Sequence, residues 1–321
     1  MNELETGAML DHYRIESVAA RTGMSVLYKG TDTEMGKVVA IKVPYAEMEA
    51  DPVLFERFKR EEEIGQLLDH HGIVKTFQHE ERTRVYMVLE WVDGHLLRAA
   101  LNEQKKLPIA RAVKIVLGMC QVLDSMHKHG VVHRDLKPEN VMIDEHGHVK
   151  LIDFGIAMKE DARRLTFVNL SAMLGTPDYI SPEQVKGQRG DQRSDIYAAG
   201  VMLYEMLTGR VPFVGANPQA AMNERVLHDP TPPRELNPEI SPQLEEILYR
   251  ALERNPRHRY STAHEMAWDL EHQDEVGVAE HELRPAGSGK PGKMNARLLA
   301  YVGVALVPIA LIVLMLVLAK R

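Results

Sequence analysis

Short hydrophobic runs dominate the first ninety residues of the chain. The runs at 26–30, 38–43 and 85–92 are rich in valine and other β-favouring residues, and each is short enough to be a strand. Between the second and third runs, the charged stretch at 52–68 has helical spacing instead. The pattern predicts a small β-sheet accompanied by one helix.

From residue 108 onward, apolar residues recur three and four positions apart, as on a helix with one buried face. The first such run, at 109–130, ends at a glycine, which commonly follows a helix. A second helix should cover about 193–207 and close at Gly209. Further helices should begin at Ser241, which a proline follows, and at Thr262, which has capping-box spacing to Glu265. We therefore expect a β-rich lobe followed by a larger helical lobe.

The C-terminal part of the chain has a different pattern. Residues 298–319 include no charged side chain and would form a helix of about 33 Å, enough to cross a hydrocarbon core of about 30 Å. We predict a single membrane span there. Residues 272–297 are polar and contain AGSGKPGK, which predicts a flexible linker.

The charges around the predicted span suggest its orientation. Lys290, Lys293 and Arg297 precede it, which favours the cytoplasm for the preceding side. Residues 1–10 show neither the basic start nor the apolar run of a signal peptide. We expect a single-pass protein of the inner cell membrane whose folded part is cytoplasmic.

Composition narrows the class of protein further. The chain has 321 residues, 45% of them hydrophobic and 26% charged, which is ordinary for a globular protein. The formal net charge of −7 gives no basic footprint for nucleic acid, so that partner is not expected. Cys120 is the single cysteine, which excludes an intrachain disulfide and fits a buried helix position.

The strongest chemical pattern is HRDLKPEN at 133–140, followed by DFG at 153–155. Together these resemble the catalytic loop and the metal-binding loop of protein kinases. The resemblance implies that Asp135 accepts the proton of the substrate hydroxyl and that Lys137 reaches the γ-phosphate of ATP. It also implies that Asn140 and Asp153 hold Mg²⁺, with Mn²⁺ as an alternative. Outside this context, Asp135 would be interpreted as a turn residue.

The sequence VAIK at 39–42 resembles the strand that carries the kinase lysine. By this resemblance, Lys42 contacts the α- and β-phosphates and pairs with Glu61 from the charged helix. The alternative for Glu61 is a solvated position, because Glu62 and Glu63 follow it directly.

The phosphate-covering loop departs from the family pattern G-x-G-x-x-G. Alignment back from Lys42 places its three glycine positions at Ala20, Thr22 and Ser25. Glycine there lets backbone amides approach the phosphates and permits left-handed backbone. Its loss could cost about 1 kcal/mol at each position that needs a left-handed conformation, which predicts weakened ATP binding. The residues expected to contact this part of ATP are Ala19, Ala20, Arg21, Thr22, Gly23, Met24, Ser25, Val26 and Leu27. The resemblance places the adenine near Leu27, Ala40, Leu89, Glu90 and Val92.

The sequence GTPDYISPE at 175–183 resembles the end of a kinase activation segment, with serine at 181 in place of the usual alanine. The resemblance assigns structural roles to Thr176, Glu183, Asp195 and Arg259, the last as partner of Glu183. Because an arginine precedes Asp135, we expect activation by phosphorylation, with Thr166 and Ser171 as candidates; the alternative is an unmodified loop.

Two pairs of histidines invite a metal interpretation, namely His127 with His129 and His146 with His148. No third ligand lies at a metal-binding spacing. We expect these side chains to be exposed and without a ligand.

The resemblance covers about residues 13–270 and is greatest to bacterial serine/threonine kinases of the eukaryotic type. It implies an α+β, two-lobed kinase fold followed by a transmembrane helix, and an enzyme that phosphorylates proteins, including itself, in signalling at the membrane. Dimerisation through the kinase domain is a further expectation. The expected division is an N-terminal segment at 1–12, a kinase domain at 13–271 with lobes at 13–89 and 95–271 around a hinge at 90–94, a linker at 272–297 and a span at 298–319.

Three alternatives stay open at this point. A pseudokinase that scaffolds partners at the membrane would explain the altered glycine loop. A small-molecule kinase of the same fold is disfavoured by GTPDYISPE, which resembles a segment that positions peptides. Tyrosine specificity is disfavoured by Lys137.

Overall fold

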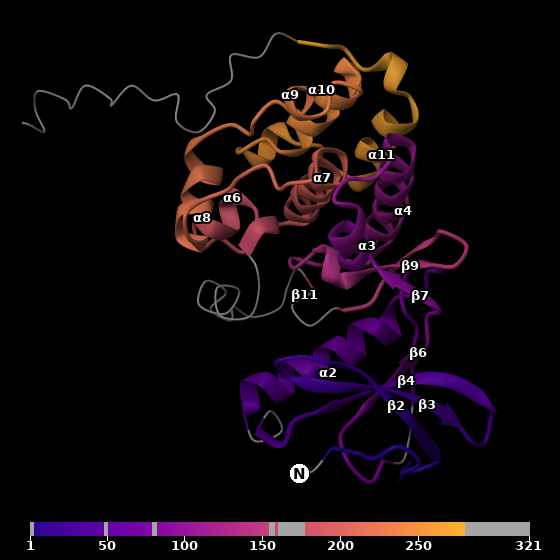
Figure 1. The fold of residues 1–321 in the computed structure, drawn as a ribbon. Coiled ribbons are helices and arrows are strands. Elements are labelled where there is room, and N and C mark those ends of the chain that lie inside the picture. The colour runs from indigo at the N-terminus through magenta and orange to yellow at the C-terminus, as the bar shows by residue number, and fades with distance from the viewer. Residues whose placement is uncertain (1–2, 48–50, 79–81, 154–157, 160–176, 280–321) are drawn as a thin grey trace, which may run out of the picture.

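The computed structural model describes residues 3–47, 51–78, 82–153, 158–159 and 177–279. These residues form a small β-rich lobe and a larger, mainly helical lobe (Figure 1). The described connection between them is the short stretch 91–93, which follows the last long strand of the small lobe.

An antiparallel sheet of six strands, in the order β1-β2-β3-β4-β6-β5, forms most of the small lobe. The strands are β1 (Met9–Leu10), β2 (Tyr13–Arg21), β3 (Ser25–Asp32), β4 (Lys37–Pro44), β5 (Thr76–Phe77) and β6 (Met87–Glu90). In β4, Val39, Ile41 and Val43 pack into a core on one face of the sheet. Ala40 belongs to a second hydrophobic cluster. This alternation, expected of a strand, directs Lys42 to the face opposite Ile41.

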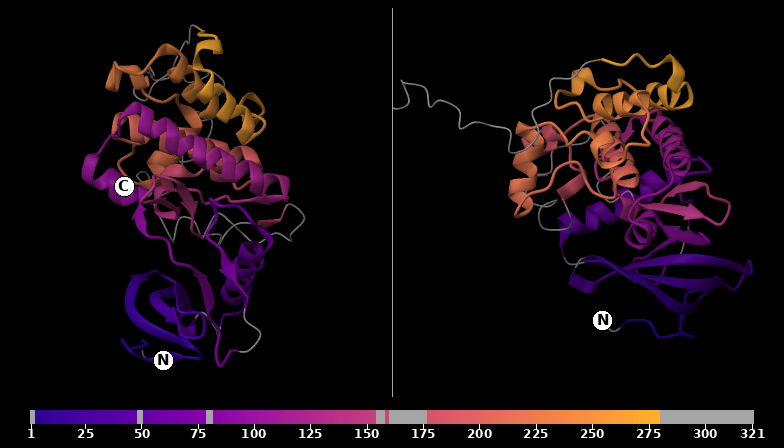
Figure 2. Two further views of the ribbon diagram at one scale, coloured as in Figure 1. Left: turned by 90° about the vertical axis from the view of Figure 1, so that its right-hand side faces the viewer. Right: turned by 45° about the horizontal axis from the view of Figure 1, so that its top comes forward.

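Helix α2 (Pro52–Leu67) lies on the side of the sheet that faces the large lobe (Figures 1 and 2). Its N-terminus is capped by Asp51, whose carboxylate accepts hydrogen bonds from the amides of Val53 and Leu54. Ile64 in this helix and Leu68, the residue directly after it, are buried in the core of the large lobe. The helix predicted at 52–68 is thereby confirmed, and it links the two lobes.

The large lobe is built around α7, in which every residue from Ser194 to Leu207 is buried. A helix buried on all sides belongs at the centre of a lobe. The helices of this lobe are α3 (Leu97–Gln104), α4 (Ile109–Lys128), α6 (Pro182–Val185), α7 (Gln192–Thr208), α8 (Pro218–Leu227), α9 (Pro233–Leu236), α10 (Pro242–Ala251) and α11 (Ala263–Glu271).

Short strands and 3₁₀ turns line the side of the large lobe that meets the small lobe. The strands are β7 (Gly94–Leu96), β8 (Val131–Val132), β9 (Val141–Asp144), β10 (Val149–Leu151) and β11 (Met158–Lys159). The 3₁₀ turns among them are η1 (Pro138–Asn140) and η2 (Pro177–Tyr179). Two further turns, η3 (Pro256–His258) and η4 (Gln273–Glu275), lie farther along the chain and do not belong to this group. The strands pair as β10-β9-β7 and β11-β8.

The predicted start and stop signals of the helices are confirmed. Gly209 ends α7 with a φ of 79°, a left-handed conformation that suits glycine. The hydroxyl of Ser241 accepts a hydrogen bond from the amide of Leu244, and that of Thr262 from the amide of Glu265. Cys120 is buried in α4, as expected.

The predicted linker begins with ordered residues. Its first part forms the turn η4, and Val276 packs against the core of the large lobe. Within the described ranges, which end at residue 279, no helix has the length and apolar character needed to cross a membrane. The span predicted at 298–319 lies outside them.

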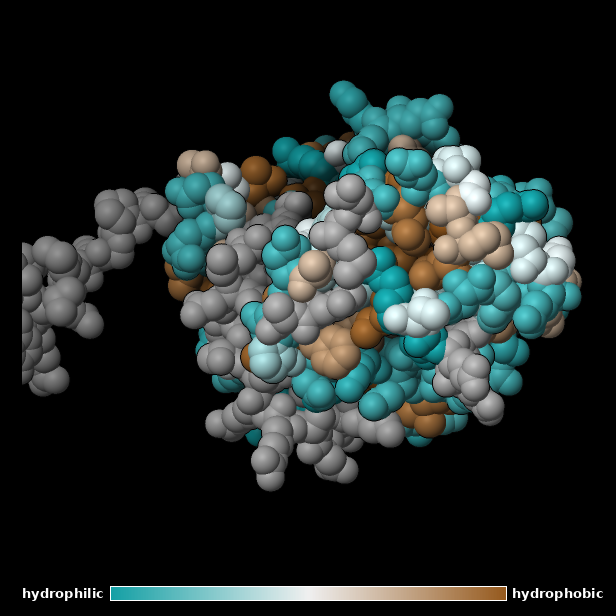
Figure 3. All heavy atoms as spheres, turned by 90° about the horizontal axis from the view of Figure 1, so that it is seen from below, coloured by the Kyte–Doolittle hydropathy of each residue, from teal (hydrophilic) through white to brown (hydrophobic). Residues whose placement is uncertain are grey.

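Seen from the end of the small lobe, the surface is mainly hydrophilic, with hydrophobic residues showing between polar ones (Figure 3). Met9, Met35 and Val38, all from this lobe, are among the exposed large hydrophobic side chains. Dimerisation through the kinase domain stays a prediction.

Candidate active site between the lobes

Lys42 is the first group of the candidate site. Its ammonium donates a hydrogen bond to Oε1 of Glu61 in α2, and it lies 4.0 Å from Oδ1 of Asp153. The side chains of Lys42 and Glu61 are 14% and 7% exposed, whereas that of Asp153 is 42% exposed. The structure therefore brings together three residues from distant parts of the chain. Of the three side chains, that of Asp153 is the one most exposed to solvent.

The ionisation of this cluster follows from its burial and charges. Burial disfavours the ammonium of Lys42, but Glu61 and Asp153 outweigh it and hold the pKa of Lys42 above its ordinary value. Burial raises the pKa of Glu61 to about 7, against the opposing charge of Lys42. Lys42 is thus a fixed cation, and Glu61 changes its charge near neutrality.

The second part of the site is the loop at 133–140, called the catalytic loop below. The ammonium of Lys137 donates a 2.7 Å hydrogen bond to Oδ2 of Asp135. Despite burial, the nearby carboxylate of Asp135 holds the pKa of Lys137 above its ordinary value. The side-chain amide of Asn140 donates to the carbonyl of Asp135 at 2.9 Å. Because the amide of Ile152 donates to the carbonyl of Asn140 at 3.1 Å, Asp153 lies beside this loop.

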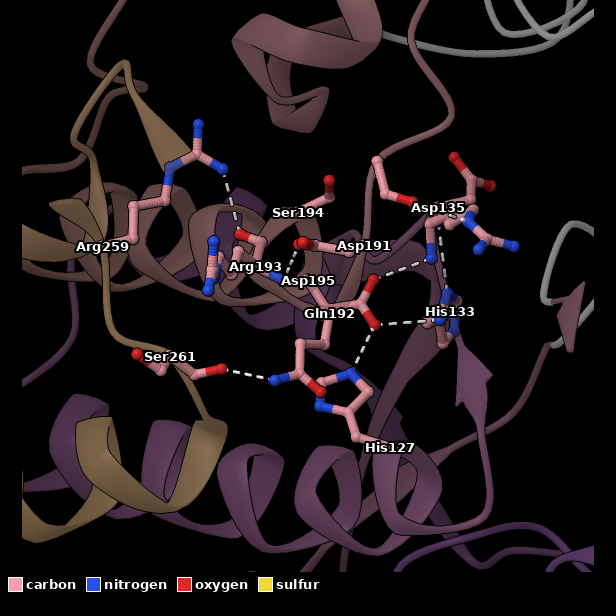
Figure 4. Close-up of polar contacts among 12 residues, drawn as sticks. His127, His133, Asp135, Asp191, Gln192, Arg193, Ser194, Asp195, Arg259 and Ser261 are labelled. Atoms are coloured by element: carbon pink, nitrogen blue, oxygen red, sulfur yellow. Dashed lines mark hydrogen bonds and ion pairs between the residues drawn. The ribbon is translucent and has the colours of Figure 1, made fainter. Parts of the chain in front are cut away.

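Asp195, in the first turn of α7, binds the backbone of the catalytic loop (Figure 4). Its carboxylate accepts hydrogen bonds from the amides of His133 and Arg134, at 2.9 and 2.7 Å. Arg134 has a φ of 64°, which is unfavourable for a residue with a side chain. The two hydrogen bonds stabilise this backbone conformation next to Asp135.

His127 also binds Asp195, and here the sequence prediction of an exposed histidine is wrong. The ring is 5% exposed, and its Nε2 lies 2.8 Å from Oδ2 of Asp195 (Figure 4). The sequence contains a signal for this burial, because Leu123 and Met119 lie four and eight residues earlier on the buried face of α4. His146 and His148 are exposed, as predicted.

Glu183 and Arg259 form a buried ion pair in the large lobe. Two guanidinium nitrogens of Arg259 donate to the two carboxylate oxygens of Glu183 at 2.8 and 2.7 Å, and the hydroxyl of Ser194 donates to the same carboxylate at 2.7 Å. Arg259 also donates to the carbonyl of Arg193 (Figure 4). Burial opposes ionisation of Glu183, but these partners hold its pKa below the ordinary value. Thr166, Ser171 and Thr176 lie outside the described residues.

Comparison with known families gives a decisive match, since the model of the protein kinase domain matches residues 20–270. The chain belongs to the protein kinase family. A probable serine/threonine kinase of Streptomyces coelicolor is 40% identical to it over 264 residues, 81% of this chain and 39% of the relative. The serine/threonine kinase PknB of Mycolicibacterium smegmatis is 37% identical over 265 residues, 81% of this chain and 42% of the relative.

The fold agrees with a solved kinase structure. The kinase domain of Mycobacterium tuberculosis PknI has a TM-score of 0.66 and 25% identity; the match covers 84% of this chain and all of that domain. The two-lobed kinase fold predicted from the sequence is confirmed. The chain described here spans about two fifths of the length of the curated relatives that it matches.

Membership of the family implies use of ATP with a divalent metal ion, and the residues present fit such an ion. Asp153 offers a partly exposed carboxylate. Asn140 is buried, and its hydrogen bond through Nδ2 leaves the side-chain oxygen available. Oxygen ligands from one or two side chains suit Mg²⁺, which keeps several waters and binds phosphates. Among the described residues, no group of three or more histidine, cysteine, aspartate or glutamate side chains could hold a metal.

An apolar cluster lies where the resemblance places the adenine. Ala40 and Leu89 are directly opposite each other on β4 and β6. Leu27 and Val92 are partly buried against the same cluster. The amide of Glu90 donates to the carbonyl of Lys75, and its carboxylate accepts two hydrogen bonds from Lys150. The described residues thus provide an apolar surface next to Lys42.

The hairpin between β2 and β3 corrects one expectation. The predicted cost of losing glycine assumed left-handed backbone at Ala20, Thr22 or Ser25. None of these residues has a positive φ, and neither does Gly23. The hairpin closes without this strain, so any effect of the missing glycines on ATP binding has another cause.

One network near the catalytic loop was missed in the sequence. The guanidinium of Arg98, on α3, donates to Glu139 at 2.8 Å and to Glu205 at 2.9 Å, and also binds the hydroxyl of Tyr179. Tyr179 in turn donates to Glu205. These residues come from four separate segments, and no local pattern relates them.

Proposed function

We propose that this chain is an ATP- and Mg²⁺-dependent kinase that transfers the γ-phosphoryl group to serine or threonine hydroxyls of proteins. The observation that carries the proposal is the position of Lys42, which is paired with Glu61 and lies 4.0 Å from Asp153. A buried lysine between two carboxylates would hold a positive charge at a fixed position, where the phosphates of a nucleotide could contact it. The related proteins named above as serine/threonine kinases support the substrate class.

Each residue of the site then has a role in binding the nucleotide. Lys42 would contact the α- and β-phosphates, and Glu61 would fix the direction of its ammonium. Asn140 and Asp153 would hold Mg²⁺ or Mn²⁺, which neutralises charge on the phosphates when bound. Leu27, Ala40, Leu89 and Val92 would contact the adenine, with backbone hydrogen bonds near Glu90.

Asp135 would act on the substrate hydroxyl. One of its oxygens is taken by Lys137, which leaves the other to accept the hydroxyl proton as the new oxygen–phosphorus bond forms. The bond to the β-phosphate oxygen breaks, and ADP leaves with that electron pair. Lys137, held 2.7 Å from Asp135, would also reach the γ-phosphate and offset its charge. The pseudokinase alternative is not supported, because the relatives named above are serine/threonine kinases and this chain retains Lys42, Asp135, Asn140 and Asp153.

The remaining parts of the proposal concern the position and control of the kinase. We place the kinase domain at 13–271, in the cytoplasm, with a linker at 272–297 and a span at 298–319 that anchors it in the inner membrane. Signalling at the membrane would follow from this position. Phosphorylation of Thr166 or Ser171 would activate it.

Labelled ATP tests the proposal directly. We expect the full chain in membranes to label itself or added proteins on serine or threonine when Mg²⁺ is present, and Asp135→Asn to abolish the label. Asp274→Asn is a matched control, because this aspartate is exposed and lies far along the chain in η4. Absence of label from the unaltered chain with either Mg²⁺ or Mn²⁺ would favour the scaffold instead.

A further inference from the structure

The tip of the β2–β3 hairpin is closed by a side chain. The amide of Thr22 donates to the carbonyl of Ser25 at 2.9 Å, so Gly23 and Met24 form the turn. The hydroxyl oxygen of Thr22 accepts hydrogen bonds from the amides of Met24 and Ser25, at 3.2 and 3.0 Å. It also lies 3.1 Å from the carbonyl and 3.0 Å from the hydroxyl of Ser25. Two amides of the turn therefore point to a hydroxyl of the hairpin itself.

The position of this tip relates it to the phosphates. Leu27 lies directly opposite Lys42 in the β3–β4 pair, and Ser25 lies two residues further toward the tip, opposite Pro44. The amide of Tyr45 donates to the carbonyl of Met24 and fixes the tip to the end of β4. Phosphates that contact Lys42 would thus lie near the end of the strand pair that carries the tip and its amides.

A bound phosphate would compete with the Thr22 hydroxyl for these amides. Hydrogen bonds to a charged oxygen are roughly twice as strong as those between neutral groups, so phosphate is the better acceptor. Before an amide can reach phosphate, however, its bond to Thr22 must break, and part of the gain is lost. Backbone strain would not weaken ATP binding here, because no residue from Ala20 to Ser25 has a positive φ.

We propose that Thr22 is a positioning residue that lowers the affinity of this kinase for the phosphates of ATP. Its hydroxyl holds the amides of Met24 and Ser25 within the hairpin. This inference rests on the proposed function, because it requires a bound nucleotide. It assigns the weakened ATP binding predicted from the sequence to one hydroxyl group.

Binding of ATP and adenosine separates this effect from others, since adenosine has no phosphates. We expect Thr22→Ala and Thr22→Val to lower the Kd of Mg²⁺-ATP about fivefold, the equivalent of one net hydrogen bond, and to leave that of adenosine unchanged. Thr22→Ser keeps the hydroxyl and should keep the wild-type ratio of the two affinities. Thr33→Ala is a control, since this threonine donates to the carbonyl of His12 at another turn of the small lobe.

Calorimetric titration of the full chain in detergent gives both affinities. Unchanged or weaker ATP binding in Thr22→Ala and Thr22→Val would overturn the proposal, as would an equal gain for ATP and adenosine. Either result could occur while the unaltered kinase still labels protein, so the proposed function would stand. If the unaltered chain binds no ATP and transfers no label, the proposed function itself fails.

Discussion

The amide of Arg134 donates a 2.7 Å hydrogen bond to the carboxylate of Asp195, and this bond holds Arg134 at a φ of 64°. A left-handed residue with a side chain costs about 1–2 kcal/mol. The direction of the neighbouring Asp135 therefore depends on a carboxylate sixty residues further along the chain.

Asp195→Asn tests this dependence. The asparagine keeps the shape but replaces one acceptor oxygen by a donor that faces an amide. We expect a loss of about 2 kcal/mol in positioning, which corresponds to roughly thirtyfold in kcat. The KM for ATP should change little, because Lys42 is on the other lobe. A raised KM with unchanged kcat would contradict this, and thermal unfolding of the variant serves as the control for stability.

The activity of the kinase should depend on the charge of Glu61. Its pKa of about 7 means that Glu61 takes up a proton as the pH falls through neutrality, and its ion pair with Lys42 is then lost. We expect kcat/KM to fall on the acid side of pH 7, and Glu61→Gln to remove this limb while lowering the plateau.

A matched control is available on the same helix. Glu62 pairs with Arg82 instead, so Glu62→Gln should keep the acid limb. If the limb persists in Glu61→Gln, another group is responsible for it.

Loss of the buried pair between Glu183 and Arg259 should destabilise the large lobe. Arg259→Ala leaves a buried carboxylate without its cation, which costs about 3–5 kcal/mol of unfolding free energy. Arg257→Ala, at an exposed position two residues earlier, should stay within about 0.5 kcal/mol of the wild type. Chemical denaturation at pH 7 measures both; equal stability of the two variants would exclude a major role for the pair.

The same pair gives a stability prediction for acid. The folded state lowers the pKa of Glu183 below its ordinary value of 4.5, so the stabilisation is complete above that pH. It is lost as the pH falls through the lower folded value, because the carboxylate must then take up a proton. The difference between wild type and Arg259→Ala should therefore shrink when denaturation is repeated at pH 3.

Removal of the metal should stop phosphoryl transfer. We expect a chelator to abolish labelling and Mg²⁺ to restore it. Asp153→Asn removes a charged oxygen ligand, so about tenfold more Mg²⁺ or greater should be needed for half-maximal activity. Titration of labelling against Mg²⁺ measures this, and the same requirement in Asp153→Asn as in the wild type would remove Asp153 from the metal site.

Much of the fold could be predicted because its signals are local. Asp51, Ser241 and Thr262 act on amides two or three residues away, so their helices begin where the sequence indicates. The grouping of Lys42 with Asp153 could be predicted only through the family resemblance. No periodicity relates residues so far apart in the chain.

What the sequence did not reveal depends on tertiary contacts. The partner of His127 is Asp195, which α7 brings against α4, and the network of Arg98 requires four segments to meet. The hairpin was misjudged for another reason. The predicted cost of losing glycine depended on a left-handed φ, whereas the hydroxyl of Thr22 closes the turn by hydrogen bonds without one.

The first turn of α7 supports two parts of the large lobe at once. Asp195 binds the catalytic loop, and the adjacent Ser194 binds Glu183. A substitution in this turn would therefore disturb the catalytic loop and the buried Glu183–Arg259 pair together.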